Sequence, residues 1–501
     1  MREARGYVGR LVAAARTVRR AAAAFAAVAV TAASAAAAAP PFDPAPWVAD
    51  LEQAREVFAT KYANLEWAVY EREADLPALF AETRSRVEAA ASDADARAAF
   101  ERLTRRLGDG HVRFVWPTAA ATLPAEPRHA DCGALGYEAR MRASPMVANA
   151  IGYRPLPASA GEEFPAGTLE VGGRVVGVLE IGVFTEKGFP ELCTRALAAL
   201  HVDAADVCGP DCGDRVDTWA AAQLTRDLAR RVRELGEAGA QLLLVDISGN
   251  GGGSEWAEAA ARMLTPIRLR SSRVGFVRGE HWASGFAQTE TELKIAADAT
   301  DGADRALLLG LARQVSDRRL IAATACDAAP LWVGQPMACQ WLGKGFYASG
   351  LLASADPLAL AGKPWAGKVF SPARYPYEEG VWQGPLVVLI DGGTASAAEE
   401  FAALLQDNHA ALVVGAPSTG AGCGHTDGGT PTRLVHSGAI LEVPDCVRLR
   451  ADGTNEVMGI QPDVLIGLRR EDGRHRAAAR LVGVLPVILR RFPATRPGAT
   501  Q

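Results

Sequence analysis

The sequence predicts an α/β protein with a small helical domain at its N-terminus. Apolar runs typical of buried strands alternate with amphipathic, helix-like segments in two stretches of the chain. Two of the predicted strands run directly into glycine-rich loops, in the sequences QLLLVDISGNGGG and PLVVLIDGGTAS. Strands that alternate with helices at this spacing indicate an α/β core, whereas the first part of the chain after residue 42 shows helical periodicity only.

The helical N-terminal domain is expected at residues 43–112. Apolar residues recur at helical-turn spacing over residues 47–65, and again within SDADARAAFERLTRRLGDGHV. Ser92 or Asp93 can cap the last helix, and Gly108 can end it by taking the left-handed conformation.

The α/β core is expected in two parts, at residues 113–255 and 381–495. Between them, residues 256–380 lack the strand-helix alternation and indicate an insertion or cap whose role the sequence does not reveal. The core elements that we predict are a strand at 174–184, a helix at 214–235, a strand in QLLLVD, a strand at 385–391, a helix at 395–406 and a strand in ALVVG.

Residues 1–39 have the composition of an export signal. Six of the first twenty residues are arginines, and an acid-free, alanine-rich stretch follows at 21–39. Within that stretch, Ala33-Ser34-Ala35 provides small residues for cleavage. A membrane anchor is the alternative, but alanine is a weak hydrophobe and prolines end the stretch at residues 40–41. We therefore expect a periplasmic or secreted protein with no stable membrane insertion once the signal is cleaved.

The net charge of −5 provides no basic field, so a nucleic-acid partner is not expected. Eight cysteines agree with export, because an even set in an oxidising compartment usually pairs. A zinc site is disfavoured, since CGPDC has no second cysteine or histidine pair after it. Loop length favours three disulfides and leaves a fourth pair: Cys208–Cys212, Cys326–Cys339, Cys423–Cys446 and Cys132–Cys193.

Ser396, in DGGTASAAEEF, is a candidate nucleophile. It lies between a strand and a helix, where backbone N–H groups and the positive end of the helix dipole are available. The glycines at 251–253 can bring further N–H groups close to a bound oxygen, and a hydroxyl beside such donors suits acyl transfer. The alternative is that the serine only caps a helix and that the glycines only turn the chain.

Two other motifs lack glycines that they require. Ser254 stands where the third glycine of a dinucleotide-binding loop belongs. Thr394 and Ala398 occupy the glycine positions of a G-x-S-x-G nucleophile elbow.

LLLVDISGNGGG and GPLVVLIDGGTASAAEEFAALLQDNHAALVVGAPSTGAG together resemble the paired signatures of the tail-specific, or C-terminal-processing, serine peptidases. The resemblance covers mainly residues 170–255 and 380–465. It implies a crotonase-like or Clp-like α/β core with Ser396 as the nucleophile. It also implies an oxyanion hole formed by the N–H groups of Ala397 and of a loop glycine, for which we expect Gly252.

The base is expected to be a histidine. Ser-Lys members of the family carry a lysine in a turn resembling FGKG, but this chain has TGAG, with Ala421 at the lysine position. The tricorn-like branch uses histidine and glutamate, and its motifs resemble LGDGHV and NEVMGIQPD. The match implies His111 as the base and Glu456 as the acid that orients it. His425, just past the vacant lysine position, is the rival base.

Residues 116–167 show no convincing PDZ module, so recognition of a free C-terminus is not implied. We expect an exported serine endopeptidase that cleaves peptides or unfolded proteins through an acyl-enzyme and requires no metal or organic cofactor. A catalytically inactive binding protein and an esterase that uses the same serine are the alternatives. The substrate and homo-oligomerisation stay open.

Overall fold

The computed structural model describes residues 42–117, 131–139, 146–157, 163–203, 206–424, 432–468 and 472–492. The predicted signal segment and His425 lie outside these residues. No helix in the described ranges combines the length and the apolar character needed to cross a bilayer.

A seven-stranded mixed sheet forms the centre of the fold, in the order β13-β9-β8-β5-β4-β3-β2. The strands from β13 to β4 pair in parallel, and β3 and β2 continue the sheet antiparallel. The predicted α/β core is therefore confirmed. The strands span Arg154–Pro155 (β2), Ala166–Val171 (β3), Arg174–Glu180 (β4), Leu242–Asp246 (β5), Leu386–Ile390 (β8), Leu412–Gly415 (β9) and Val464–Leu465 (β13).

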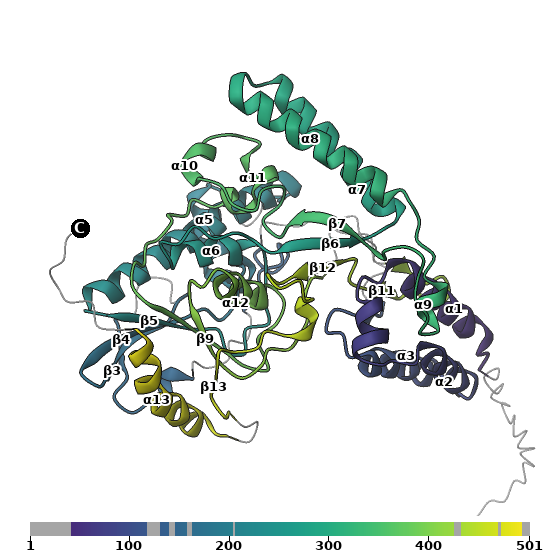
Figure 1. The fold of residues 1–501 in the computed structure, drawn as a ribbon, viewed down its shortest axis with the longest axis horizontal. Coiled ribbons are helices and arrows are strands. Elements are labelled where there is room, and N and C mark those ends of the chain that lie inside the picture. Colours follow the sequence, from purple (N-terminus) through teal and green to yellow (C-terminus); the bar gives the residue numbers. More distant parts are fainter. Residues whose placement is uncertain are drawn as a thin grey trace, which may run out of the picture. The chain divides into compact units, whose positions relative to one another are not determined.

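Helices cover both faces of this sheet, with α13 on the face opposite α5 and α6 (Figure 1). In β5, Leu243 and Val245 join the core on the face of α5, while Leu242 and Leu244 join the core on the face of α13. A strand buried on both faces reads as a continuous apolar run, which is why LLLV carries no alternation. The covering elements are η4 (Glu186–Gly188), α4 (Pro190–Ala199), α5 (Pro210–Glu237), α6 (Trp256–Met263) and α12 (Ala397–Asp407) on one face, with η3 (Val147–Asn149) and α13 (Arg474–Arg491) on the other.

The N-terminal part is helical, as predicted. Ser92 precedes α3 and its hydroxyl accepts the N–H of Asp95 at 3.2 Å, and Gly108 ends the helix with φ +75°. The core of these helices also takes in residues of a small antiparallel sheet, β1-β11-β10. The elements are α1 (Ala45–Lys61), η1 (Trp67–Glu71), α2 (Leu76–Glu88), α3 (Asp93–Leu107), β1 (Arg113–Val115), β10 (Thr432–Arg433) and β11 (Ile440–Glu442).

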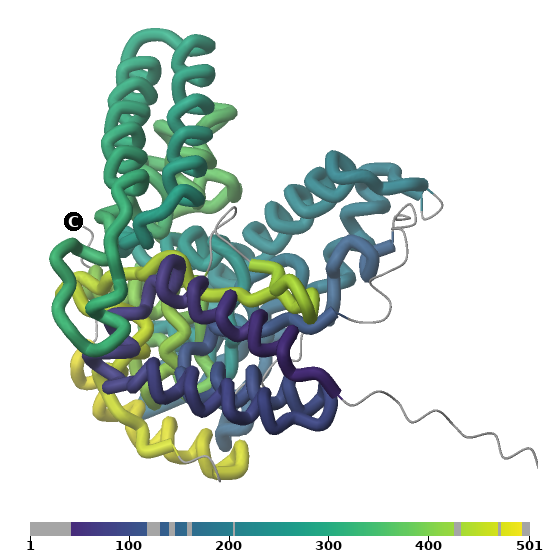
Figure 2. Tube along the Cα trace, turned by 90° about the vertical axis from the view of Figure 1, so that its right-hand side faces the viewer, coloured from purple at the N-terminus to yellow at the C-terminus, as the bar shows by residue number. Residues whose placement is uncertain are grey.

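The segment that sequence reasoning left without a role builds a second sheet. Its strands β6 and β7 pair antiparallel, and β6 also pairs with β12, which comes from the second half of the chain. Helices α7 and α8 lie between β6 and β7 in the chain and pack as a long antiparallel pair (teal-green in Figure 2). The bounds are β6 (Arg273–Val277), α7 (Glu280–Asp298), α8 (Gly302–Ala322), α9 (Ala329–Trp332), β7 (Leu342–Tyr347), α10 (Pro357–Leu360), α11 (Ala366–Val369), η5 (Ser371–Arg374), β12 (Cys446–Leu449) and η6 (Glu456–Met458).

The four predicted disulfides are confirmed: Cys132–Cys193, Cys208–Cys212, Cys326–Cys339 and Cys423–Cys446. Three of them close loops of fewer than thirty residues, which is the pairing that loop length favours.

Trp341 offers a test of how firmly the segment before β7 is joined to the N-terminal helices. Its ring is buried in their shared core, and its indole N–H donates to the carbonyl of Tyr62 at 3.0 Å. We expect Trp341→Ala to lower the free energy of unfolding by about 3–5 kcal/mol, measured by urea denaturation of the oxidised protein. Leu358→Ala is the control, because Leu358 is exposed. A change at Trp341 as small as that of the control would contradict the shared core.

Candidate active site

The glycine loops after β5 and β8 meet because the two strands are parallel neighbours in the sheet. The Asp391 carboxylate accepts the N–H of Gly249 at 2.7 Å and that of Gly393 at 2.9 Å. The N–H of Ala395 donates to the carbonyl of Asn250 at 3.0 Å. These bonds join both loops into one surface at the carboxyl ends of the strands, where open α/β sheets bind ligands.

Ser396 occupies a special backbone position at the start of α12. Its φ of +56° and ψ of −120° are unfavourable for a residue with a side chain, so the surrounding contacts must hold it there. The residue is partly exposed and borders a cavity of about 530 Å³. The structure therefore places Ser396 at an accessible surface and not in a packed interior.

Two backbone N–H groups lie beside this serine. Ala397 begins α12, so its N–H is among those that a helix leaves unbonded at its first turn. A Cβ on Gly252 would lie 2.9 Å from the Ala397 nitrogen, so this close approach requires glycine. The N–H of Gly252 itself donates to the side chain of Asn250 at 2.8 Å.

Gly253 presents the next N–H group of the same loop. Gly253 forms a parallel bridge with Phe184, in which the residues on either side of the glycine make the two hydrogen bonds. The N–H of Gly253 consequently points away from Phe184. Gly253 lines the cavity together with Ser396 and Ala397, and a side chain on it would collide with the Phe184 backbone.

Glu399 connects the serine to a turn formed by residues 418–422. One carboxylate oxygen accepts the Ser418 hydroxyl at 2.5 Å and the N–H of Gly420 at 2.6 Å. The other accepts the N–H groups of Ser396 and Ala421, both at 2.9 Å. Sequence reasoning missed this residue, although a glutamate three positions after a helix-capping serine is a recognisable capping-box signal.

His111 packs against this same turn. Its Nδ1 lies 2.8 Å from the carbonyl oxygen of Ala421. Because a carbonyl can only accept, Nδ1 carries the proton of the neutral ring and Nε2 keeps a free lone pair. Nε2 faces Gly424, where a Cβ would lie 3.6 Å away. Burial lowers the pKa of His111, and the nearby charge of Asp109 opposes this shift only in part.

Asp109 fixes the backbone that carries His111. Its carboxylate is buried and accepts the N–H of His111 at 2.9 Å, the hydroxyl of Tyr62 at 2.9 Å and the amide of Asn64 at 2.8 Å. Three donors to one carboxylate hold the turn after α3 in a single arrangement. In the motif LGDGHV, Gly108 ends α3, Asp109 anchors the turn that follows, and His111 places its imidazole against Ala421.

Arg448, on β12, joins Ser396 to two buried carboxylates. The guanidinium donates to the carbonyl oxygens of Ser396 at 2.9 Å and of Gly422 at 2.8 Å. It also pairs with Glu400 at 3.2 Å and, at closer range, with Glu456. Burial raises the pKa of Glu400 to about 8, although the charge of Arg448 acts in the opposite direction. Sequence reasoning gave no indication of this arginine, because the contact spans chain segments that only the fold brings together.

Glu456 is buried at the start of η6, and its carboxylate binds Arg448. Among the residues that the structure describes, no hydrogen bond joins Glu456 to His111. The structure thus brings Glu456 to the arginine beside the serine, and it brings His111 to the turn that Glu399 organises. His425, the rival base, falls outside the described ranges, but its neighbour Gly424 lies beside the His111 ring.

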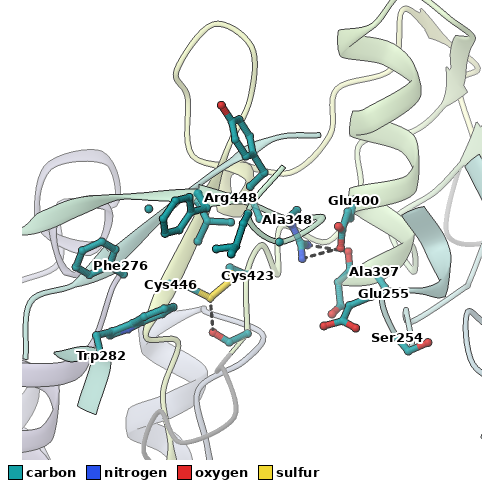
Figure 3. A pocket seen from close by; sticks show the side chains of 18 of the residues that line it. Ser254, Glu255, Phe276, Trp282, Ala348, Ala397, Glu400, Cys423, Cys446 and Arg448 are labelled. Atoms are coloured by element: carbon teal, nitrogen blue, oxygen red, sulfur yellow. Dashed lines mark hydrogen bonds and ion pairs between the residues drawn. A yellow bond between two sulfur atoms is a disulfide. The ribbon is translucent and has the colours of Figure 1, made fainter. Parts of the chain in front are cut away.

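The cavity beside Ser396 has an aromatic side and a side formed by residues next to the serine (Figure 3). Phe276 and Trp282 form one side, and Ala397, Glu400 and Ser254 form the other. The Cys423–Cys446 disulfide also lines the cavity and fastens the turn near His111 to β12. The space is large enough for part of a substrate.

The class of this protein, a serine-type peptidase, follows from a match to a protein family. A model of peptidase family S41 matches residues 215–466, which make up half of the chain, and the chain belongs to this family. The match includes both glycine loops, Ser396 and Glu456, whereas His111 precedes it.

Solved structures share the fold over most of the chain. Mature CPAF has a TM-score of 0.57 at 13% identity, with 89% of this chain and 97% of that chain covered. Mature CPAF complexed with lactacystin has a TM-score of 0.55 at 13% identity, with 89% and 98% covered. A comparison with curated protein sequences gives no match.

Arg448→Met tests the buried ionic network. Without the guanidinium, Glu456 and Glu400 remain buried and unpaired, and we expect the free energy of unfolding at pH 8 to fall by about 3–5 kcal/mol. Burial then raises the pKa of these carboxyls above their unfolded values, so the loss should grow as the pH rises from 5 to 8. Urea denaturation at several pH values measures both effects.

The matched variant for this test is Arg374→Met, which removes an exposed ion pair with Glu255. Its effect should stay below about 1 kcal/mol at every pH. Combining Arg448→Met with Glu456→Gln should recover part of the loss. Equal effects of the two arginine substitutions would show that Arg448 does not neutralise buried charge.

Proposed function

We propose that this chain is an exported serine endopeptidase that cleaves peptides or unfolded proteins through an acyl-enzyme on Ser396, with His111 as the general base. The observation that carries the proposal is the docking of His111 on the carbonyl of Ala421. Ala421 stands where Ser-Lys relatives carry their catalytic lysine. The turn that would carry the lysine here accepts a hydrogen bond from an imidazole, which supports His111 as the replacement for that lysine.

The chemistry follows from this placement. Ser396 Oγ attacks the substrate carbonyl carbon while Nε2 of His111 takes the hydroxyl proton, and the imidazolium then protonates the leaving amine. A water molecule, activated by the same nitrogen, hydrolyses the ester. The N–H groups of Ala397 and Gly253 stabilise the oxyanion, and Gly252 allows the loop to lie against the serine.

Two buried networks support these groups. Glu399 holds the backbone of Ser396 and the turn that binds His111 in a fixed relation. Glu456 was expected to orient the imidazole. It instead binds Arg448, whose guanidinium donates a hydrogen bond to the carbonyl of Ser396. The Ala421 carbonyl supplies the acceptor that fixes the imidazole tautomer.

Export is supported by the composition of residues 1–39 and by the four disulfides, which persist in oxidising compartments. The signal segment lies outside the described residues, so the proposal of export rests on its sequence and on the cysteines.

A fluorophosphonate probe tests the nucleophile. We expect the oxidised protein to be labelled and to degrade an unfolded protein, and we expect Ser396→Ala to lose both properties. Ser284→Ala, at an exposed position of α7, should retain them. An unlabelled, inactive wild-type protein would favour a binding protein on this fold, and turnover of activated esters without proteolysis would favour an esterase.

The pH profile tests the base. Because burial lowers the pKa of His111, the imidazole stays neutral to a lower pH than an exposed one. The kcat/KM should therefore fall as the pH decreases, with a midpoint below the ordinary histidine value of about 6.5.

Histidine variants identify the residue behind that titration. His111→Ala should lower kcat/KM by about 10²–10⁴-fold, and the acid limb of the remaining activity should disappear. His475→Ala, at an exposed site on α13, is the control. Full activity of His111→Ala combined with loss in His425→Ala would assign the base to His425.

A further inference from the structure

The cavity beside Ser396 has an apolar wall that comes from the segment inserted between the two parts of the core. It measures about 530 Å³ and includes Ser396 and Ala397 at one side. The apolar residues that line it are Val274, Phe276, Trp282, Phe286, Phe346 and Leu351. They belong to β6, α7, β7 and the turn after β7, none of which carries a residue of the proposed reaction.

This wall is held in shape by its own packing. The ring centroid of Phe276 lies 5.3 Å from that of Trp282 and 5.0 Å from that of Phe286. The indole N–H of Trp282 donates to the carbonyl of Asp445 at 3.0 Å. Phe276 is fully buried and supports the wall from behind, whereas Trp282 is partly exposed and can contact a ligand. Because β6 is the middle strand of its sheet, this apolar wall exists before a ligand arrives.

Most charged groups around the cavity have partners, but Oε1 of Glu400 is buried without a hydrogen-bond partner among the described residues. Arg448 pairs with Glu400 and Glu456, and Glu255 pairs with Arg374 at 3.2 Å. A charged substrate side chain would lose hydration on entering this largely apolar space. An aromatic side chain would instead exchange water for stacked rings.

We propose that this cavity is the specificity pocket of the site and binds a large apolar side chain, preferably aromatic, from a substrate residue adjoining the scissile bond. The proposal rests on the proposed function and names its substrate class. The inserted segment, through β6 and α7, is then what selects the bond that Ser396 attacks.

Internally quenched peptides test the pocket. Two series vary one residue on the acyl side or on the leaving side of a single cleavable bond, with Phe, Leu, Ala, Lys or Glu at that position. We expect kcat/KM in one of the series to be at least about tenfold higher for Phe than for Ala, since burying an aromatic ring is worth that much discrimination. Lys and Glu should fall at or below Ala.

Ala348→Phe provides the structural test, because Ala348 is small, partly exposed and borders the cavity in the turn after β7 (Figure 3). A ring at this position fills the space, so the ratio of Phe to Ala peptides should fall by about tenfold. Ala323→Phe, at an exposed position after α8, should leave that ratio unchanged.

Labelling by the fluorophosphonate distinguishes a failure of the pocket proposal from a failure of the proposed peptidase function. A labelled, active enzyme that cleaves all peptides of both series at similar rates would overturn the pocket and leave the peptidase standing. The pocket would also be overturned if the Ala348→Phe variant kept the wild-type ratio of kcat/KM between Phe and Ala peptides. Labelling and the melting temperature would first have to show that this variant is correctly folded. Absence of labelling in the wild type would overturn the proposed function itself.

Discussion

The carboxylate of Glu399 is the contact on which the arrangement of the site depends. It is fully buried, and its two oxygens accept backbone N–H groups from the serine and from the turn at 420–422. A buried carboxylate is tolerated only when such donors satisfy it, so separating the two chain segments would leave this carboxylate without its hydrogen-bond partners. One side chain thereby ties the strained serine that precedes α12 to a turn more than twenty residues further along the chain.

The second constraint is that the imidazole comes from far away in the sequence. His111 follows the third N-terminal helix, and it reaches the site only because that helical region shares a core with β11 and with the strands of the inserted segment. The hydrogen bonds from Tyr62 and Asn64 to the buried Asp109 carboxylate then fix the position of the turn that carries His111. The helical region is therefore a part of the proposed active site and not an appendage to the sheet.

The sequence predicts those features of the fold that depend on residues close together in the chain. Apolar runs gave the buried strands, Ser92 and Gly108 marked the ends of α3, and short loops between cysteines led to the disulfides. The motif resemblance selected Ser396, His111 and Glu456 as residues to examine. Arg448 was missed because nothing in CVRLRADG distinguishes an arginine that binds a distant serine carbonyl from one that faces solvent.

The glycine loop shows the same limit on a smaller scale. Three consecutive glycines predict backbone donors near the serine, but they do not reveal which N–H is free. Asn250 engages the N–H of Gly252, and the bridge with Phe184 turns that of Gly253 outward. Likewise, β6 and β7 are interrupted by glycines and form no continuous apolar run, and the pairing of β6 with β12 depends on tertiary contact.

The sheet formed by β12, β6 and β7 means that the inserted segment cannot be excised as a module. Its middle strand is the hydrogen-bonding neighbour of the strand that carries Arg448 and Cys446. β12 is already an edge strand of this sheet, so removing β6 would leave it without any neighbouring strand among the described residues. Shortened relatives of such a chain would need another strand in that place, so variation among them should accumulate in the α7–α8 hairpin and not in the two strands at its base.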